Sequence, residues 1–289
     1  MSKSVSWSKG LRVSSAAACG AFAGAAFAGA ALGAESTPPN FAPSSNVGWI
    51  AFGTEFLPPA AGPGPVMYDP AHPRVSNAEA AATGKQPTFH IGDPTSEILQ
   101  PWAKEELRKR NAFILAGNPG YTRQAACWPM GVPAFLLYPV QPIYIVQSAK
   151  EVVMISQQDH ATRHIYLNVP HSARVAPSWY GESVGHYEGD TLVVDTIGLN
   201  SQTYVDNYRT PHTDKLHVVE RFRMTDGGKI LEVSLHVEDP GAFTTSWNAI
   251  QRYRKSEQAP IGESFCAEGN FNYFNFNVEP IPQAPKPDF

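Results

Sequence analysis

The sequence predicts a mainly β protein built around an antiparallel, up-and-down barrel of about eight strands. Three observations lead to this prediction. From Pro133 onward, apolar and polar residues alternate with the period of two that is typical of half-buried strands. Turn signals separate these runs, notably "EGD" at 188–190 and "DGG" at 226–228, which favour tight antiparallel hairpins. Before them, residues 35–94 are rich in proline and glycine, which disfavour helices.

The first residues have the three parts of a secretory signal. Lys3, Lys9 and Arg12 precede an uncharged run of Ala, Gly and Phe that ends in small residues. We expect residues 1–34 to be removed by cleavage, so that the mature protein is periplasmic or secreted. A membrane anchor is the alternative, but Glu35 ends the weakly apolar run early. After cleavage we expect no contact with the membrane.

The stretch between the signal and the barrel contains two candidate elements. Within the arm of residues 35–94, expected to be mostly irregular, "VGWIAFGTEF" is apolar enough to be a docked strand. The next segment, residues 95–132, contains one short predicted helix over residues 96–110. Pro101 suits the first turn of the main part of this helix.

Eight apolar runs of strand length follow in the barrel segment, residues 133–266. They are "QPIYIVQS", "EVVMISQQ", "RHIYLN", "ESVGHYE", "TLVVDT", "LHVVERFRM", "KILEVSLHVE" and "AFTTSWNAIQRYRK". A meander of this kind hides its edges most completely by closing into a barrel, whose interior has room for side chains or one small ligand. We therefore expect a lipocalin-like barrel, with a two-sheet β-sandwich as the alternative, and a C-terminal tail at residues 267–289.

Charge and cysteine content narrow the range of partners. The chain has 289 residues and a formal net charge of −4, which gives no electrostatic footprint for a polyanion and argues against nucleic acid as a partner. Of the 3 cysteines, Cys19 lies in the signal, whereas Cys127 and Cys266 would remain in an oxidising compartment. We expect these two to form a disulfide; two free thiols are the alternative.

Strand parity assigns Glu220 to the barrel interior. In "LHVVERFRM", Glu220 is in phase with Val218 and Phe222, whereas His217 points to the other face. A buried carboxylate needs a partner, and in "RHIYL" Arg163 shares the phase of the apolar residues. The sequence predicts a buried Arg163–Glu220 pair, which serves either as a structural device or as part of an acid/base site.

The long connections predict an open mouth at one end of the barrel. In an up-and-down meander, residues 169–181 and 197–215 fall at the same end as the "DPG" turn at 239–241, while "EGD", "DGG" and the short turn with His160 fall at the closed end. The mouth carries His171 and His212. We expect ligand contacts from Arg163, Trp179, Tyr204 and Trp247, the last of which either lines the pocket or belongs to the core.

These groups favour two classes of function. The first is a lyase, isomerase or hydrolase that acts by acid/base chemistry on a small hydrophobic or aromatic compound, with Glu220, His212 and His171 as catalytic residues. The alternative is a non-catalytic periplasmic small-molecule binding protein. We expect no cofactor and no metal; a metal site assembled from His171, His186, His212 and a carboxylate is the alternative. "GESVG" at 181–185 continues into a hairpin and is no nucleophile elbow.

Three stretches resemble the motifs of a large, mostly uncharacterised family of secreted bacterial proteins. They are "APSWYGESVGHYEGDTLVVDTIGLN", "HTDKLHVVERFRM" and "VEDPGAFTTSW", within residues 127–266. Family members tend to read G-x-S-x-G-x-W-E-G-D-T-L-V-V-D-T, H-S-x-x-L-x-V-x-E-R and D-P-x-x-[YF]-T-x-P-W, from which Tyr187, Thr213 and Ser246 depart. The resemblance implies a shared barrel and site but no particular reaction. The matching motif positions include His212, Glu220, Arg221, Asp239 and Trp247.

Overall fold

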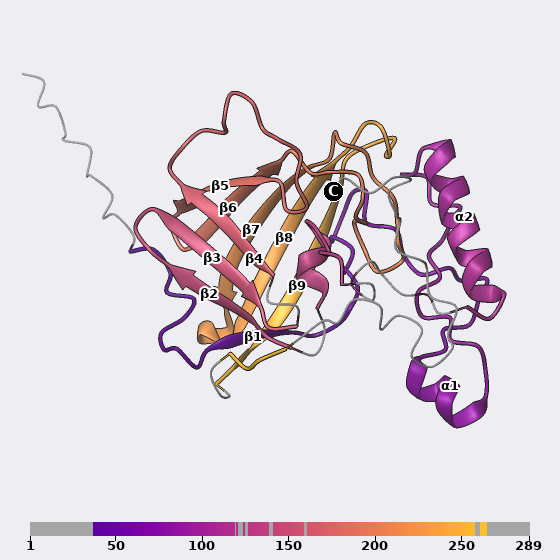
Figure 1. Ribbon diagram of the computed structural model, residues 1–289. Helices are drawn as coiled ribbons and strands as arrows, with labels where there is room; N and C mark the ends of the chain where they lie inside the picture. Colours follow the sequence, from indigo (N-terminus) through magenta and orange to yellow (C-terminus); the bar gives the residue numbers. More distant parts are fainter. Residues whose placement is uncertain are drawn as a thin grey trace, which may run out of the picture. The chain divides into compact units, whose positions relative to one another are not determined.

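The structure is a computed structural model that describes residues 37–118, 120, 124, 127–138, 141–158, 161–257 and 261–264. Within these residues, nine strands form a closed barrel, and they follow one another around the ring in the order of the sequence (Figure 1). The mainly β fold and the barrel predicted from the alternating runs are confirmed.

Eight of the strands coincide with the eight predicted runs. They are β2 (Ile143–Gln147), β3 (Glu151–Ser156), β4 (Thr162–Leu167), β5 (Glu182–Glu188), β6 (Thr191–Ile197), β7 (His217–Thr225), β8 (Ile230–Glu238) and β9 (Trp247–Ser256). Along β3, β4 and β8, buried residues alternate with more exposed ones. The period of two in the sequence thus separates the interior of the barrel from its outer surface.

The ninth strand comes from the arm that was expected to be mostly irregular. β1 (Gly48–Ala51) pairs with β9, Gly48 lying opposite Ser256 and Ala51 opposite Tyr253. On its other side Trp49 lies opposite Ile143 of β2. The docked strand expected in "VGWIAFGTEF" is therefore confirmed, and it is the strand that closes the barrel.

The expectation of a wholly antiparallel meander is wrong at one pair. β4 and β5 run parallel, with Ile165 opposite Ser183 and Leu167 opposite Gly185. A closed ring with an odd number of strands cannot alternate in direction throughout, so the addition of β1 requires one such pair. The connection over residues 168–181 consequently carries the chain from one end of the barrel to the other.

The strand directions distinguish two ends of the barrel. The hairpin end carries the connections 148–150, 189–190 and 226–229, and the loop end carries 157–161, 198–216, 239–246 and the long segment 52–142. The predicted long connection after β6 and the "DPG" turn after β8 do share the loop end, whereas the other predicted long connection, residues 169–181, crosses from the hairpin end to the loop end. The prediction that placed the turn near His160 at the opposite end is wrong, because it did not allow for the parallel pair; His160 itself lies outside the described residues.

The segment of residues 52–142 contains the helical elements of the described chain apart from the 3-10 turn η3 (Asp226–Gly228), which joins β7 to β8. They are α1 (Asn77–Thr83), α2 (Pro101–Leu115) and the 3-10 turn η2 (Ala134–Leu137). α2 begins later than predicted because Leu99 forms a β-bridge with Phe243, which holds the residues before Pro101 in an extended conformation. The sequence did not predict α1, whose start is capped by the Ser76 side chain.

The interior of the barrel is filled by side chains. Inward-facing residues such as Val218, Phe222 and Val233 are almost completely buried, and each such side chain contributes about 1.5–3 kcal/mol relative to exposure. η2 packs against inward residues of β9, since Leu136 O accepts hydrogen bonds from Tyr253 Oη at 2.6 Å and from Gln251 Nε2 at 3.3 Å. The segment 52–142 is thereby tied to the barrel core.

Candidate functional site

The predicted buried pair of Arg163 and Glu220 is confirmed. Arg163 Nη1 donates to Glu220 Oε1 at 2.9 Å, and Nη2 donates to Oε2. Arg163 is 1% exposed and Glu220 is 0% exposed. Arg163 also donates to Ser183 Oγ at 3.3 Å and to Thr196 Oγ1 at 2.8 Å. These four side chains form an interior polar cluster that joins β4, β5, β6 and β7.

The interior polar cluster leaves Glu220 little capacity for acid/base work. Both carboxylate oxygens accept from one guanidinium, so protonation of either oxygen would break a charge-assisted hydrogen bond. Burial, together with the charge of Glu220, raises the pKa of Tyr253 well above its usual value. Tyr253 is therefore a neutral phenol beside the pair. This geometry favours the structural interpretation of Arg163 and Glu220.

A surface pocket of about 410 Å³ reaches the interior polar cluster beside the parallel pair. The ladder of β4 and β5 begins only at Ile165 and Ser183, and residues 174–176 lie beside the unpaired start of β4. We call this the β4–β5 pocket. Its lining includes Arg163, Tyr166, Tyr180, Glu182 and Ser183 but does not include Glu220. The pocket thus ends at the guanidinium side of the ion pair.

His171 lies on the outer surface, in a row of alternating histidines and carboxylates. His171 Nδ1 is 3.0 Å from Glu182 Oε1, and its Nε2 is 3.1 Å from Asp195 Oδ1. The same oxygen of Asp195 is 3.0 Å from His217 Nε2. His217 therefore points away from the interior, as strand parity predicted.

The row continues across the neighbouring strands to β9. His217 Nδ1 is 3.3 Å from Glu238 Oε2, whose other oxygen is 3.0 Å from His236 Nε2. His236 Nδ1 is 2.9 Å from Asn248 Oδ1. We call the six titratable residues the histidine row: Glu182, His171, Asp195, His217, Glu238 and His236.

The contacts of the histidine row place more acceptor oxygens at two of the rings than a neutral imidazole can donate to. A neutral imidazole has one N–H, yet His171 and His217 each have carboxylate oxygens at both ring nitrogens. Both contacts of such a ring are hydrogen bonds only in the imidazolium form. The pKa of Glu182 is lowered, mainly by the hydroxyl of Ser172, and the pKa of Glu238 is lowered mainly by His236. The histidine row is thus a surface on which carboxylates and imidazoles contact one another in alternation.

His212 lies elsewhere, in the loop-end connection, where residues 203–212 are buried throughout. Its Nδ1 is 2.9 Å from Thr213 O, and its Nε2 is 2.8 Å from Thr203 Oγ1. Because a carbonyl oxygen only accepts, Nδ1 carries the proton and the Thr203 hydroxyl donates to Nε2. Burial lowers the pKa of His212, which favours this neutral form. His212 therefore fixes the buried loop.

The three predicted catalytic residues belong to three different groups of contacts. Glu220 is in the interior polar cluster, His171 in the histidine row and His212 in the buried loop. Among the described residues, no hydrogen bond or ion pair joins any two of them. The structure does not bring Glu220, His171 and His212 together in one site.

The predicted ligand contacts are also dispersed. Trp179 is half-buried and packs edge-on against Trp128, with ring centroids 5.0 Å apart. Tyr204 is buried in the loop-end connection, and Trp247 is buried in the core. Of the four, Arg163 alone lines the β4–β5 pocket.

Asp206 is a perturbed acid in the same buried loop. Burial raises the pKa of Asp206 to about 6. Its Oδ1 accepts from the backbone N–H of Thr210 at 3.0 Å, whereas Oδ2 is buried without a hydrogen-bond partner among the described residues. A buried carboxylate with one unsatisfied oxygen lowers the stability of the fold when it ionises.

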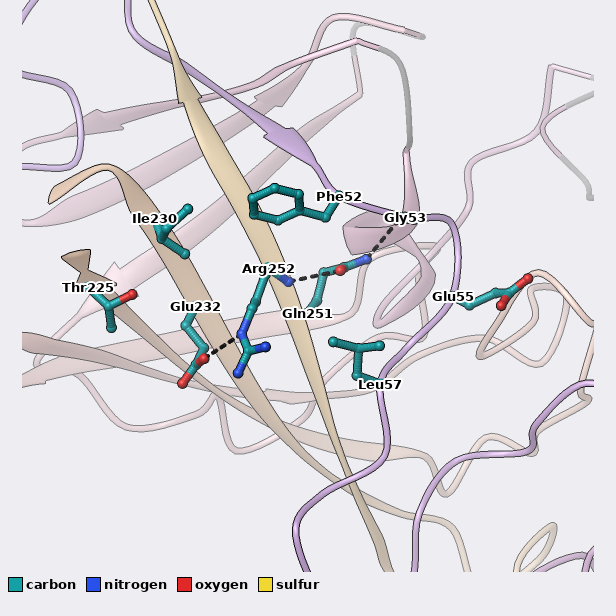
Figure 2. Close-up of a pocket in the computed structure, with 9 residues that line it drawn as sticks. All are labelled: Phe52, Gly53, Glu55, Leu57, Thr225, Ile230, Glu232, Gln251 and Arg252. Atoms are coloured by element: carbon teal, nitrogen blue, oxygen red, sulfur yellow. Dashed lines mark hydrogen bonds and ion pairs between the residues drawn. The ribbon is translucent and has the colours of Figure 1, made fainter.

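Another pocket, of about 640 Å³, lies on the outer wall of the barrel and was not predicted (Figure 2). Residues 52–57 run beside β9, where Phe52 N donates to Arg252 O and Leu57 N donates to Ile250 O, each at 2.9 Å. We call this the outer-wall pocket. It is lined by Phe52, Gly53, Glu55, Leu57, Thr225, Ile230, Glu232, Gln251 and Arg252.

No local pattern marks the outer-wall pocket in the sequence. Phe52 and Arg252 come from opposite ends of the barrel-forming chain and meet only because β1 and β9 pair. Two residues give a weak indication of the pocket. Ile230 is apolar although it lies on the outward face of β8, and the apolar Phe52 follows β1 directly. Neither observation identifies a pocket without the closure of the barrel.

Several predictions concern residues outside the described part of the chain. These are the secretory signal, His160, Cys266 and the C-terminal tail. Cys127 is described, but its expected partner Cys266 is not, so the disulfide stays a prediction.

Comparisons of this chain with protein-family models, with curated proteins and with solved structures found no match. The resemblance carried by the three motifs stays a prediction. Among the described residues, no group of three or more His, Cys, Asp or Glu side chains is placed to hold a metal ion. In that same part of the chain, no helix is both long and apolar enough to cross a bilayer.

Proposed function

We propose that the protein binds a small hydrophobic or aromatic compound without transforming it, and that the compound occupies the outer-wall pocket. One observation carries this proposal. Phe52 is 61% exposed and Leu57 is 44% exposed, and both line a concave surface. Large apolar side chains exposed together in a pocket are typical of ligand-binding sites. The pocket volume of about 640 Å³ suits a small molecule.

Two physical features support binding at this place. A ligand that covers Phe52 and Leu57 removes apolar surface from water, which contributes about 25 cal/mol for each Å². The backbone that carries these side chains is already held to β9 by hydrogen bonds at 2.9 Å. Little conformational entropy is therefore lost on binding, which preserves the gain from apolar burial.

Acid/base catalysis is a second proposal, and one observation favours it. Glu182 lines the β4–β5 pocket and forms a hydrogen bond with His171, which also contacts Asp195. A substrate in that pocket would lie beside this acid/base pair. Loss of turnover in His171→Gln, with substrate binding retained, would support this second proposal.

We also propose that the ligand is bound outside the cytoplasm, in the periplasm or the medium. The basic, apolar and small residues of the first 34 positions support export. The expected disulfide between Cys127 and Cys266 suits the same compartment.

The proposed function is tested with an uncharged, fluorescent aromatic probe such as 2-naphthol. Leu57→Ser removes an apolar wall of the outer-wall pocket, and Leu115→Ser on α2 is a matched control because both leucines are 44% exposed. We expect Leu57→Ser to raise the dissociation constant by about fivefold or more, since a buried leucine contributes about 1.5–3 kcal/mol. The control should bind like the wild type. Equal binding by all three proteins would contradict the proposal.

A further inference from the structure

We infer that the ligand of the outer-wall pocket is an apolar acid, whose carboxylate binds the guanidinium of Arg252 while its hydrocarbon part covers Phe52 and Leu57. This inference rests on the proposed function and adds the chemical class of the ligand. It would make the protein a carrier or receptor of small aromatic or aliphatic carboxylic acids.

The guanidinium of Arg252 has hydrogen-bond donors that no described residue uses. Its Nε donates to Glu232 Oε2 at 2.7 Å, and among the described residues the side chain of Arg252 forms no other hydrogen bond or ion pair. Nη1 and Nη2 therefore keep their N–H groups for a ligand. Figure 2 shows the guanidinium between Glu232 and Leu57, beside the apolar part of the lining. A planar guanidinium with free donors matches the two oxygens of a carboxylate.

Glu232 prepares Arg252 for this task. The two residues lie opposite each other in the register of β8 and β9, so that the ion pair holds the arginine side chain over the sheet. An arginine that is already oriented loses less side-chain entropy when a ligand binds. The ion pair thus positions Arg252 and does not occupy its terminal nitrogens.

The charges around the pocket favour an anion. Both lining carboxylates are paired, Glu55 with Arg74 at 2.6 Å and Glu232 with Arg252 at 2.7 Å. Arg254 occupies the next outward position of β9, opposite Ile230, is exposed, and has no hydrogen-bond or ion-pair partner among the described residues. Glu55, Glu232 and Arg252 line the pocket, and Arg74 and Arg254 lie beside the lining. Together these five residues carry one excess positive charge.

An amine is a poorer fit. It would need an unpaired carboxylate, yet Glu55 and Glu232 each already form an ion pair with an arginine. An uncharged compound would use the apolar surface but would leave the Nη donors of Arg252 to water. The acid is the class that uses both parts of the lining.

Calorimetric titration with three matched compounds tests the inference. They are 3-phenylpropionate, 3-phenylpropan-1-ol and 3-phenylpropylamine, which share one hydrocarbon part. We expect the acid to bind about tenfold or more tightly than the alcohol at low ionic strength, because charge-assisted hydrogen bonds are strong and salt weakens them. In Arg252→Gln this advantage should disappear, while the affinity for the alcohol stays within about twofold.

Arg221→Gln is the control, because Arg221 is 44% exposed and paired with Glu188, much as Arg252 is 46% exposed and paired with Glu232. It should retain the preference for the acid. Tighter binding of the amine, or an unchanged preference in Arg252→Gln, would overturn the inference and leave the proposed function standing. Failure of all three compounds to bind the wild type would overturn both.

Discussion

Arg163 and Glu220 form a two-point ion pair inside the barrel, with Nη1 of Arg163 2.9 Å from Oε1 of Glu220 and its Nη2 bonded to Oε2. The pair spans from β4 to β7, and the hydroxyls of Ser183 and Thr196 supply further acceptors for the guanidinium. Charges buried this completely are stable only as a pair.

Removal of one partner should therefore be costly. Glu220→Gln leaves the charge of Arg163 buried and uncompensated, so we expect the free energy of unfolding to fall by about 3–5 kcal/mol. Urea denaturation measures this change. The double substitution Arg163→Leu with Glu220→Leu should recover most of the loss, because the interior polar cluster then holds no uncompensated charge. A Glu220→Gln protein as stable as the wild type would refute the structural role of the pair.

Asp206 should make the free energy of unfolding fall as the pH rises, whereas an ion-paired carboxylate makes it rise. Its pKa is raised to about 6 from 3.8, so the folded state holds the proton more tightly than the unfolded state does. The stabilising contribution is complete below about pH 4 and is lost as the pH rises through about 6. A pKa raised from 3.8 to about 6 corresponds to about 3 kcal/mol of stability. Asp206→Asn, which keeps an oxygen for the N–H of Thr210, should lack this dependence. Parallel pH profiles for the two proteins would contradict this.

The histidine row offers a test by NMR titration. The pKa of His236 is raised, chiefly by its hydrogen bond with Asn248, with Glu238 adding to the effect and partial burial opposing it. Asn248→Ala should therefore lower the pKa of His236 towards its ordinary value. Because the pKa of His236 is raised in the folded state, the protonated ring stabilises the fold, and this contribution is lost as the pH rises through the folded-state pKa. An unchanged titration curve in the variant would show that the contact is absent in solution.

Much of the barrel could be predicted from the sequence, because in a strand with one buried face the alternation of apolar and polar residues shows which side chains face inward. The alternation in "LHVVERFRM" and "RHIYL" was enough to predict that Glu220 and Arg163 meet inside. The role of β1 was harder to predict. Its pairing partner, β9, lies at the other end of the barrel-forming chain, and four residues carry too little periodicity to indicate a barrel position.

The parallel pair and the pocket were beyond sequence reasoning for a related reason. A long connection such as 168–181 can return the chain to either end of a barrel, and its length does not indicate which. Because residues 168–181 run from one end of the barrel to the other, His171 lies on the outer surface beside Asp195 and not near the interior polar cluster that contains Glu220. The outer-wall pocket depends on residues that only the closed barrel brings together, and Arg252 is not distinguished from other outward arginines by its local sequence.

The disulfide remains a specific prediction of the sequence. If Cys127 and Cys266 pair, the bond closes a loop of nearly half the chain and contributes about 4–5 kcal/mol in the chain-entropy model. Thiol labelling of the mature protein under denaturing, non-reducing conditions should then find no free cysteine. Two labelled thiols would show that the pairing is wrong.

The most direct test of the proposed binding site is chemical-shift mapping by NMR with 3-phenylpropionate. If the outer-wall pocket binds the ligand, the largest shifts of backbone amides should fall on Phe52, Gly53 and Leu57 and, across the sheet, on Ile230 and Arg252, the residues that line it. Largest shifts around Tyr166 and Tyr180 of the β4–β5 pocket, or no shifts at millimolar ligand, would contradict the proposal.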